Sequence, residues 1–308
     1  MRARWSAGHS HMPSWCDLMD FRYAILDVDD VLLTTQQAEP RAARALLEAL
    51  SAYLDSEKAA AVHREFVAHW RTLQRRHWSC AETAEDDYAV LEQSIAHWQR
   101  GVTEQGYQIK LWSRQVLLAC ALASQRVDVS ERLVRGVTEA YWQEMAESVK
   151  VHPDGVAAIQ RLGSTGCHVH LATDSDGFLV FDESEQTFTY DPEASAREKI
   201  RRLRALWSLG LGPRDVTIGD PIGKPDTEFS KRTIAEFSGK VGHAVDVRRT
   251  VVVGDSFARD VEPFLRVGVA FGVWLVRDRA DDETRSCGHA RVAVVSSLAE
   301  SWHTAPTG

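Results

Sequence analysis

Short apolar segments alternate with helical segments through the second half of the chain, and this alternation restricts the possible folds more than any other feature. Strand-like segments lie at residues 21–26, 168–172, 216–218, 250–253 and 269–276, with a weaker one at 291–295. Most are continuously apolar, as expected for strands that are covered on both faces of a sheet. Helical patterns at 153–163, 194–209 and 227–238 separate the later segments. The pattern predicts an α/β fold, a doubly wound parallel sheet with right-handed crossovers.

Residues 36–149 have a different character, and we call them the helical insert. They contain almost no strand signals and are rich in Ala, Leu, Glu, Gln and Arg. The expected helices lie at 40–54, 57–77, 84–100, 108–123 and 130–148. We therefore predict an all-helical domain between the first strand and the rest of the sheet, with a core formed by residues 21–35 and 150–308. Residues 1–20 are treated as an N-terminal extension, and residues 178–190 are expected to form a β-hairpin.

The bulk composition excludes several classes of protein. With 308 residues, 44% of them apolar, the chain is long enough for two folding units. Its net charge of −8 argues against nucleic-acid and membrane-surface partners, which need a basic face, but allows a small anionic substrate. No apolar run is long enough for a transmembrane helix. Five cysteines without C-x-x-C spacing suggest reduced thiols, so we expect a cytoplasmic protein.

Three acids in the sequence Asp27-Val28-Asp29-Asp30 follow the first predicted strand directly. In an open parallel sheet, ligands bind at the carboxyl ends of the strands. Clustered carboxylates repel one another unless a cation lies among them. The alternative interpretation is a solvated acidic turn.

A second apolar strand ends in an acid at Gly254-Asp255, and Asp260 follows shortly after it. Asp255 could complete an oxygen-ligand site for Mg²⁺, and Asp260 could orient a ligand or a water in the second coordination sphere. Both could instead cap the helix that follows, an alternative more plausible for Asp260 than for Asp255.

Two further residues have the chemistry to bind phosphate. Thr173 directly follows the strand segment at 168–172 and offers a hydroxyl group. Lys224 precedes Pro225, which holds it in an extended conformation. Taken alone, a threonine at a strand end usually marks a turn, and most lysines are solvated.

Together these residues resemble the haloacid dehalogenase (HAD) superfamily of hydrolases, most of which are phosphatases. The family pattern is a D-x-D strand end, a Thr or Ser strand end, a Lys often followed by Pro, and an acidic G-D-x-x-x-x-D. The matching residues are Asp27 and Asp29, Thr173, Lys224, and Asp255 and Asp260. The resemblance covers residues 21–35 and about 150–300. It implies a Rossmann-like core, with the helical insert as a cap of the type placed after the first strand.

The sequence departs from the family pattern at three positions. Asp30 and Val31 stand where Gly and Thr are frequent, and Asp174 stands where Asn is common. We count Asp174 as a candidate substrate contact, although this substitution puts the contact in question.

The resemblance implies a mechanism. Asp27 attacks phosphorus and forms an aspartyl-phosphate, and Asp29 acts as general acid and then as general base. Mg²⁺ is bound by Asp27, Asp255 and the backbone carbonyl of Asp29, while Thr173 and Lys224 stabilise the transferring group. Because dehalogenases lack an acid at the position of Asp29, we expect a phosphatase that acts on a small phosphorylated metabolite.

Two other functions stay open, a phosphomutase and a catalytically silent binding protein. Phosphonate hydrolysis is disfavoured, because it needs a cap lysine and the insert has only Lys58 and Lys110. Substrate choice should depend on the insert, which we expect to close over Asp27 about hinges near 34–37 and 149–153. Arg64, Arg71 and Arg75 share a helix face that could meet an anionic substrate but more often would be solvated. The oligomeric state stays open.

Overall fold

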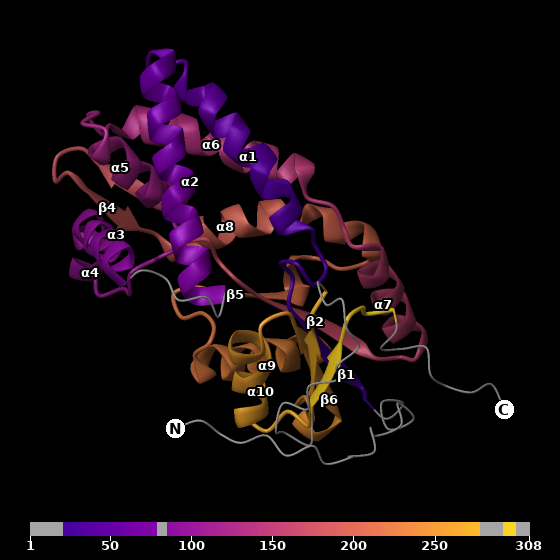
Figure 1. Ribbon diagram of the computed structural model, residues 1–308. Helices are drawn as coiled ribbons and strands as arrows, with labels where there is room; N and C mark the ends of the chain where they lie inside the picture. The colour runs from indigo at the N-terminus through magenta and orange to yellow at the C-terminus, as the bar shows by residue number, and fades with distance from the viewer. Residues whose placement is uncertain (1–20, 79–84, 278–291, 300–308) are drawn as a thin grey trace.

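The computed structural model of the chain describes residues 21–78, 85–277 and 292–299. The predicted N-terminal extension, 1–20, therefore lies outside the described residues. Six strands form one parallel sheet in the order β5-β2-β1-β6-β7-β8 (Figure 1). Their bounds are β1 (Tyr23–Leu26), β2 (His168–Asp174), β5 (Val216–Gly219), β6 (Thr250–Gly254), β7 (Phe271–Leu275) and β8 (Val292–Val295). The predicted α/β fold with a doubly wound parallel sheet is confirmed.

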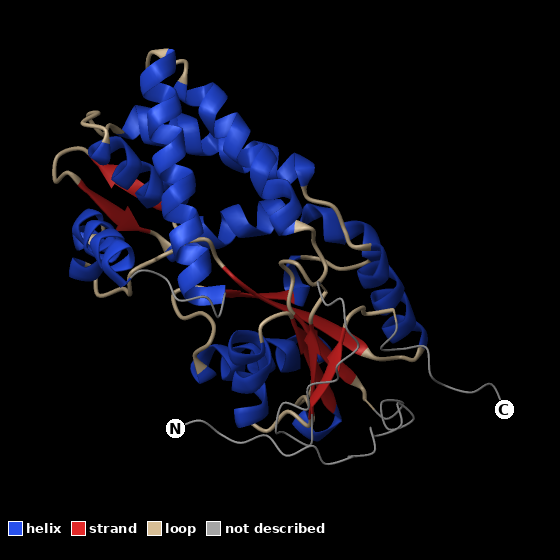
Figure 2. Cartoon of the chain, in the orientation of Figure 1, coloured by secondary structure: helices blue, strands red, loops and turns tan. Residues whose placement is uncertain are grey.

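Helices cover both faces of this sheet (Figure 2). On β1, Tyr23 and Ile25 belong to the apolar cluster formed with α9 (Thr227–Val241) and α10 (Glu262–Arg266). Ala24 and Leu26 point to the opposite face, towards the cluster that contains α7 (Pro153–Ser164). Successive strand residues face opposite sides of a sheet, so a strand that is buried on both faces must be apolar throughout. The sequence of β1 meets this requirement.

The helical insert consists of six helices and contains no strand among its described residues. They are α1 (Thr35–Leu50), α2 (Ser56–Trp78), α3 (Glu85–Trp98), α4 (Arg100–Glu104), α5 (Arg114–Ser124) and α6 (Glu131–Ser148). No helix among the described residues is long and apolar enough to cross a lipid bilayer.

Three predicted helix bounds were wrong. Helix α1 begins at Thr35 rather than at 40, because the Asp30 side chain accepts a hydrogen bond from Gln36 N at 2.8 Å and fixes an earlier start. Residues 108–113 precede α5 as a loop, since Lys110 N donates to Gln99 Oε1 at 2.7 Å instead of to the backbone of a helix. The third predicted helix ends at Trp98, and the short α4 follows it.

The predicted hairpin is present as β3 (Leu179–Asp182) and β4 (Thr187–Tyr190), and it packs against the helical insert. Thr187 Oγ1 donates to Trp98 O at 2.9 Å and accepts from Gly101 N at 3.0 Å. Phe181 and Phe188 place their rings 5.9 and 6.4 Å from that of Trp98. A Cβ at position 101 would lie 2.7 Å from Phe188 O, so glycine is what allows this close approach. The hairpin therefore packs with the insert although it lies outside residues 36–149. The division of the chain at these residues stays a prediction.

The two chain segments that connect the core to the insert pair with each other. Leu33 forms an antiparallel bridge with Val151, Thr34 N donates to Lys150 O at 2.9 Å, and Lys150 N donates to Thr34 Oγ1 at 3.0 Å. The expected hinge segments therefore start from one small paired region.

Arg277 connects the loop that follows β1 to Asp154 at the start of α7. Its Nε donates to Asp30 O at 3.0 Å and its Nη2 to Val31 O at 2.8 Å, while Nη1 is 2.7 Å from Asp154 Oδ2. Asp154 also accepts from Leu298 N at 3.0 Å. Although burial alone would raise it, these donors hold the pKa of Asp154 below its ordinary value of 3.8.

We expect Asp154→Asn to lower the free energy of unfolding by about 1–3 kcal/mol at neutral pH, since it leaves Arg277 without its charged partner. A carboxyl group whose pKa is depressed by folding stabilises the protein above its unfolded-state pKa and loses this effect as the pH falls through the folded-state value. The difference from wild type should therefore shrink below pH 3.8, the ordinary value for this group. Urea unfolding at several pH values measures it, and a difference that does not change with pH would contradict this account.

Candidate active site

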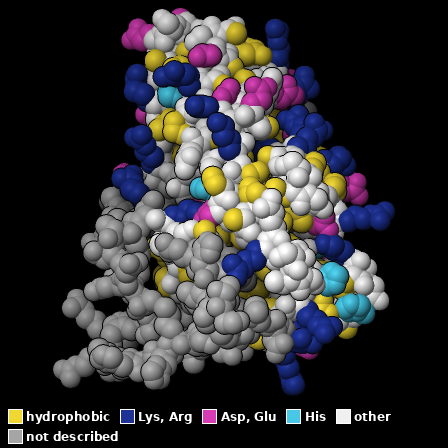
Figure 3. All heavy atoms as spheres, turned by 90° about the vertical axis from the view of Figure 1, so that its right-hand side faces the viewer, with side chains coloured by type: hydrophobic (Ala, Val, Ile, Leu, Met, Phe, Trp, Pro, Cys, Tyr) yellow, Lys and Arg dark blue, Asp and Glu magenta, His cyan; other side chains and the backbone are white. Residues whose placement is uncertain are grey.

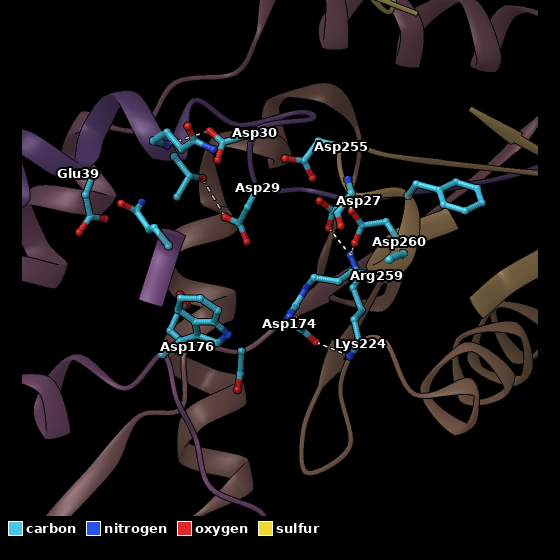
Figure 4. A pocket seen from close by; sticks show the side chains of 18 of the residues that line it. Asp27, Asp29, Asp30, Glu39, Asp174, Asp176, Lys224, Asp255, Arg259 and Asp260 are labelled. Atoms are coloured by element: carbon cyan, nitrogen blue, oxygen red, sulfur yellow. Dashed lines mark hydrogen bonds and ion pairs between the residues drawn. The ribbon is translucent and has the colours of Figure 1, made fainter. Parts of the chain in front are cut away.

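Asp27 follows β1 at the carboxyl edge of the sheet, between β2 and β6. Its backbone N donates to Val253 O at 2.9 Å, and the residue is only 7% exposed. Lys224 Nζ forms an ion pair with Asp27 Oδ1 and lies 2.9 Å from Asp260 Oδ1 (Figure 4). The sheet thus brings together three predicted site residues that are far apart in the sequence.

Three carboxylates at this edge could hold a metal ion. Asp27, Asp255 and Asp260 each offer an oxygen within 4.8 Å of the other two. Burial raises the pKa of Asp27 to about 7 and that of Asp255 to about 9, and the neighbouring carboxylates add to both shifts. Buried oxygen ligands that repel one another suit a hard divalent cation such as Mg²⁺. The residues therefore fit the predicted metal.

Asp260 lies in this same group, although the sequence suggested a role in the second coordination sphere. It sits in a π-helical turn, Phe257–Val261, after β6. Its Oδ2 accepts from Ser256 N at 2.8 Å while Oδ1 faces Lys224 Nζ. Asp260 thus positions Lys224 and the loop after Asp255, a role compatible with the predicted one. The part predicted for the backbone carbonyl of Asp29 stays a prediction.

Asp29 lies two residues beyond Asp27, and three donors hold its carboxylate. Thr35 Oγ1 donates to Oδ1 at 2.8 Å, Thr173 Oγ1 donates to Oδ2 at 3.2 Å, and Lys199 Nζ also contacts Oδ2. Burial alone would raise the pKa of Asp29, but Lys199 and Arg202 together lower it well below its ordinary value. In this structure the Thr173 hydroxyl, predicted to meet a phosphoryl oxygen, is directed at Asp29.

Sequence reasoning missed Lys199. It lies on α8 (Pro192–Arg202), and its side chain is almost completely buried. Several basic residues share this helix, and the sequence does not indicate which of them points inward. A buried lysine needs an anionic partner, and its contacts with Asp29 and Asp176 supply two.

Asp174 ends β2 and contacts the backbone of Lys224 and the guanidinium of Arg259. Its Oδ1 accepts from Lys224 N at 2.8 Å, and its Oδ2 lies 2.6 Å from Arg259 Nη2. A Cβ at Gly219 or Gly223 would lie within 2.4 Å of Asp174 Oδ1, so the loop before Lys224 can fold against this carboxylate only with glycines there. The acid that replaces the family's frequent Asn therefore has a partner of its own in Arg259.

For the phosphatase that the sequence predicts, we expect Asp174→Asn to lower kcat/KM about three- to tenfold and Asp174→Ala about 100-fold, because Asn can still accept from Lys224 N whereas Ala cannot. Hydrolysis of para-nitrophenyl phosphate measures both variants, and melting temperatures report on their folding. Equal losses in the two variants would show that the hydrogen bond to Lys224 does not matter.

Asp30 also departs from the family pattern, and its conformation explains why. It adopts φ +58°, the left-handed region that favours glycine and that Asp tolerates better than most residues. In return, its side chain caps α1 through Gln36 N. Burial raises its pKa to about 7.

A cavity of about 500 Å³ opens in front of Asp27, between the sheet edge and the helical insert. Core residues on its wall include Asp29, Asp174, Lys224, Asp255 and Arg259, and the insert contributes Gln36, Glu39, Trp70, Gln74, Trp112 and Arg114. Arg64, Arg71 and Arg75 are exposed and do not line it. The structure thus supports the solvated interpretation of that helix face and places a different arginine, Arg114, at the cavity.

Comparison with known proteins identifies solved structures that share this fold. No protein-family model matches the sequence, and no curated protein matches it. Among solved structures, the chain is similar to YfnB of Bacillus subtilis, described as a HAD-hydrolase bound to magnesium, at 15% identity over 92% of this chain and 97% of that chain, with a TM-score of 0.51. It is also similar to 2-haloacid dehalogenase from Pseudomonas syringae pv. Tomato DC3000, at 18% identity over 91% and 96% of the two chains, again with a TM-score of 0.51. The chain therefore has the haloacid dehalogenase fold, and the predicted resemblance is confirmed at the level of the fold.

Proposed function

We propose that this protein is a Mg²⁺-dependent phosphoric monoester hydrolase that acts on a small phosphorylated metabolite through an aspartyl-phosphate. One observation carries the proposal: a buried Asp27 lies beside Lys224 and two further carboxylates, and Asp29 lies on the wall of the same cavity. Such a site offers a nucleophile, a cation for the phosphoryl oxygens, a metal site and an acid–base residue.

In the first step, an Asp27 oxygen attacks phosphorus, the P–O bond to the leaving group breaks, and Asp29 gives the leaving oxygen a proton. Lys224 stabilises the charge on the transferring group. In the second step, Asp29 accepts a proton from the water that attacks the aspartyl-phosphate, so inorganic phosphate leaves and Asp27 is restored. Bound Mg²⁺ would be held by Asp27 and Asp255 and would reduce the repulsion between the nucleophile and the phosphate.

Three donors around Asp29 favour its carboxylate form, which the second step requires. The first step requires its protonated form. An approaching phosphate brings negative charge close to Asp29, and a nearby like charge raises the pKa of a carboxyl group. Substrate binding therefore favours protonation at the step that needs it.

The fold does not separate a phosphatase from a dehalogenase, since one of the similar structures is a 2-haloacid dehalogenase. Asp29 supports the phosphatase, because a departing halide needs no proton. A catalytically silent role is disfavoured, because buried carboxylates that repel one another destabilise a protein that has no use for them.

The test is release of inorganic phosphate from para-nitrophenyl phosphate in the presence of Mg²⁺, with a 2-haloacid and a phosphosugar assayed in parallel. We expect phosphate release that follows saturation kinetics. Halide release without phosphate release would indicate a dehalogenase, isomerisation of the phosphosugar without phosphate release would indicate a mutase, and no turnover at all would support a binding protein.

We further propose that the insert closes over Asp27 during the reaction, excluding bulk water. The paired segments at Thr34 and Lys150 support this, because they allow the insert to move about one region. On the face that Figure 3 presents, basic and acidic side chains are interspersed over the insert, unlike the continuous basic surface of a nucleic-acid binder.

Small phosphate esters should therefore be hydrolysed at least about 100-fold more efficiently than phosphopeptides or phosphorylated nucleic-acid ends, because a closed cavity of this size excludes macromolecules. Comparison of kcat/KM across the three substrate types measures this. A phosphopeptide that is the best substrate would show that the insert does not close.

A further inference from the structure

The carboxylate of Asp29 is oriented by side chains from three separate parts of the chain. Thr35 at the start of α1 donates to Oδ1, Thr173 on β2 donates to Oδ2, and Lys199 on α8 forms an ion pair with Oδ2. A carboxylate has about four acceptor positions, two on each oxygen, so these three donors leave one position, on Oδ1. The side chain of Asp29 is 34% exposed and lines the cavity. It is therefore fixed in orientation and still open to a reacting water.

Lys199 does not reach the substrate itself. Its side chain is 1% exposed, and it does not line the cavity, whereas its two partners Asp29 and Asp176 do. Its Nζ contacts Asp29 Oδ2 and lies 3.8 Å from Asp176 Oδ2. A buried ammonium is stable only beside such partners, so these contacts fix the position of Nζ. Lys199 can therefore influence the reaction only through the residues that it touches.

Helix α8, which carries Lys199, is anchored at both ends. At its start, the N-cap Asp191 accepts a hydrogen bond from Glu193 N at 2.9 Å. At its end, Arg202 forms an ion pair with Asp176, and its guanidinium carbon lies 4.4 Å from the ring centroid of Trp142 on α6. Figure 1 shows α8 between the helices of the insert and the sheet. Lys199 thus reaches Asp29 from a fixed support.

The two chemical steps of the proposed reaction depend differently on Asp29. In the second step a water oxygen bonds to phosphorus, the P–O bond to Asp27 breaks, and the proton of the water passes to Asp29. This step needs a carboxylate that is oriented towards the water. In the first step, a leaving group that is already a stable anion, such as para-nitrophenolate, departs without a proton from Asp29. With such a substrate, loss of the orientation of Asp29 should slow the second step alone.

Resting on the proposed function, we infer that Lys199 is a positioning residue for the second step. Its ion pair with Oδ2 keeps the free acceptor position of Asp29 directed towards the water that attacks the aspartyl-phosphate. Without Lys199, the aspartyl-phosphate forms on Asp27 as before but is hydrolysed slowly.

The test is the variant Lys199→Met, whose side chain is apolar and of similar length, assayed as the full chain with Mg²⁺ and para-nitrophenyl phosphate. We expect a burst of about one para-nitrophenolate per enzyme, followed by a kcat about 10- to 100-fold below that of wild type. Because kcat/KM reports only the steps up to formation of the aspartyl-phosphate, it should stay within about threefold of wild type, so KM falls together with kcat. Mass spectrometry of acid-quenched samples should find a larger phosphorylated fraction in the variant than in wild type.

Three further variants assign this effect to the contact with Asp29. Asp29→Asn should show the same burst, and the addition of Lys199→Met should lower its kcat by less than about threefold more, because Lys199 acts through Asp29. Arg201→Met, on the exposed face of the same helix, is the matched control and should match wild type. Lys199→Gln keeps a polar group beside Asp176 and takes the place of Lys199→Met where that variant does not fold. The same burst is expected from it.

Equal losses of kcat and kcat/KM without a burst would show that Lys199 supports only the fold, and would overturn the inference. Wild-type kinetics in Lys199→Met, or independent losses from Lys199→Met and Asp29→Asn that multiply in the double variant, would overturn it as well. If wild type hydrolyses para-nitrophenyl phosphate and the variants at Lys199 show no burst, the inference fails and the proposed function stands. If wild type releases no phosphate, the proposed function itself has failed.

Discussion

Replacement of Asp27 by Asn is expected to lower phosphate release at least about 10⁴-fold, because an amide cannot act as the nucleophile and loss of a nucleophile removes most of the catalysed rate. The fold should persist, since the two side chains have nearly the same shape. Steady-state assays with para-nitrophenyl phosphate measure the loss. Mass spectrometry of acid-quenched wild-type enzyme should in addition detect a phosphoryl group on the peptide that contains Asp27.

The control for this experiment is Glu48→Gln, which changes an exposed carboxylate and should retain full activity. The melting temperature of Asp27→Asn should not fall below that of wild type, because the change removes one of three carboxylates that repel one another. A verified pure sample that keeps a tenth of wild-type activity would exclude Asp27 as the nucleophile.

Removal of divalent metal should lower activity to below about 1% of its initial level, and Mg²⁺ should restore it, because the phosphate dianion and the clustered carboxylates repel each other without a cation. Ca²⁺ should inhibit. It takes more ligands than Mg²⁺, at longer distances, and so allows both oxygens of Asp27 to bind it at once. Full activity in excess EDTA, with metal content checked, would contradict the proposed metal dependence.

Thermal unfolding tests the metal site without turnover. Wild type should gain stability as Mg²⁺ is added, since a ligand that binds only the folded state stabilises it. Asp255→Asn should be more stable than wild type without metal and should gain little from Mg²⁺. The reason is that burial and neighbouring carboxylates raise the pKa of Asp255 to about 9, so its charge is costly until a cation balances it. Equal responses to Mg²⁺ in the two proteins would place the metal elsewhere.

The sheet could be predicted from the sequence because its strands are recognisable locally. The segment Tyr23–Leu26 is apolar throughout and is followed directly by acids. Strand β6 shows the same pattern, with Asp255 directly after it. Parallel strands end at one edge, which predicts that the acids after β1 and β6 lie together, and the resemblance to the HAD superfamily adds Lys224 to them. The helices of the insert were recognisable by composition, but their ends were not, since contacts such as the one between Asp30 and Gln36 fix them.

The residues that sequence reasoning missed act through contacts over long sequence distances. Lys199 meets Asp29 across 170 positions of the chain, and Arg114 meets Glu39 across 75. Both are cations that the fold buries beside carboxylates, whereas an arginine or lysine on a helix is solvated by default. Arg259 gave no signal either, because its partner Asp174 ends β2, 85 positions away in the sequence.

The contacts of the β3–β4 hairpin decide how this protein can be dissected. The chain leaves the core after β1, returns before α7, leaves again after β2 to form the hairpin, and returns at α8. Excision of residues 36–149 would remove the helices that bury Phe181 and Phe188. The apolar side chains of the hairpin would then be exposed to solvent. A core fragment fit for expression must therefore lose both segments, and a transplant of the insert onto another protein must carry the hairpin with it.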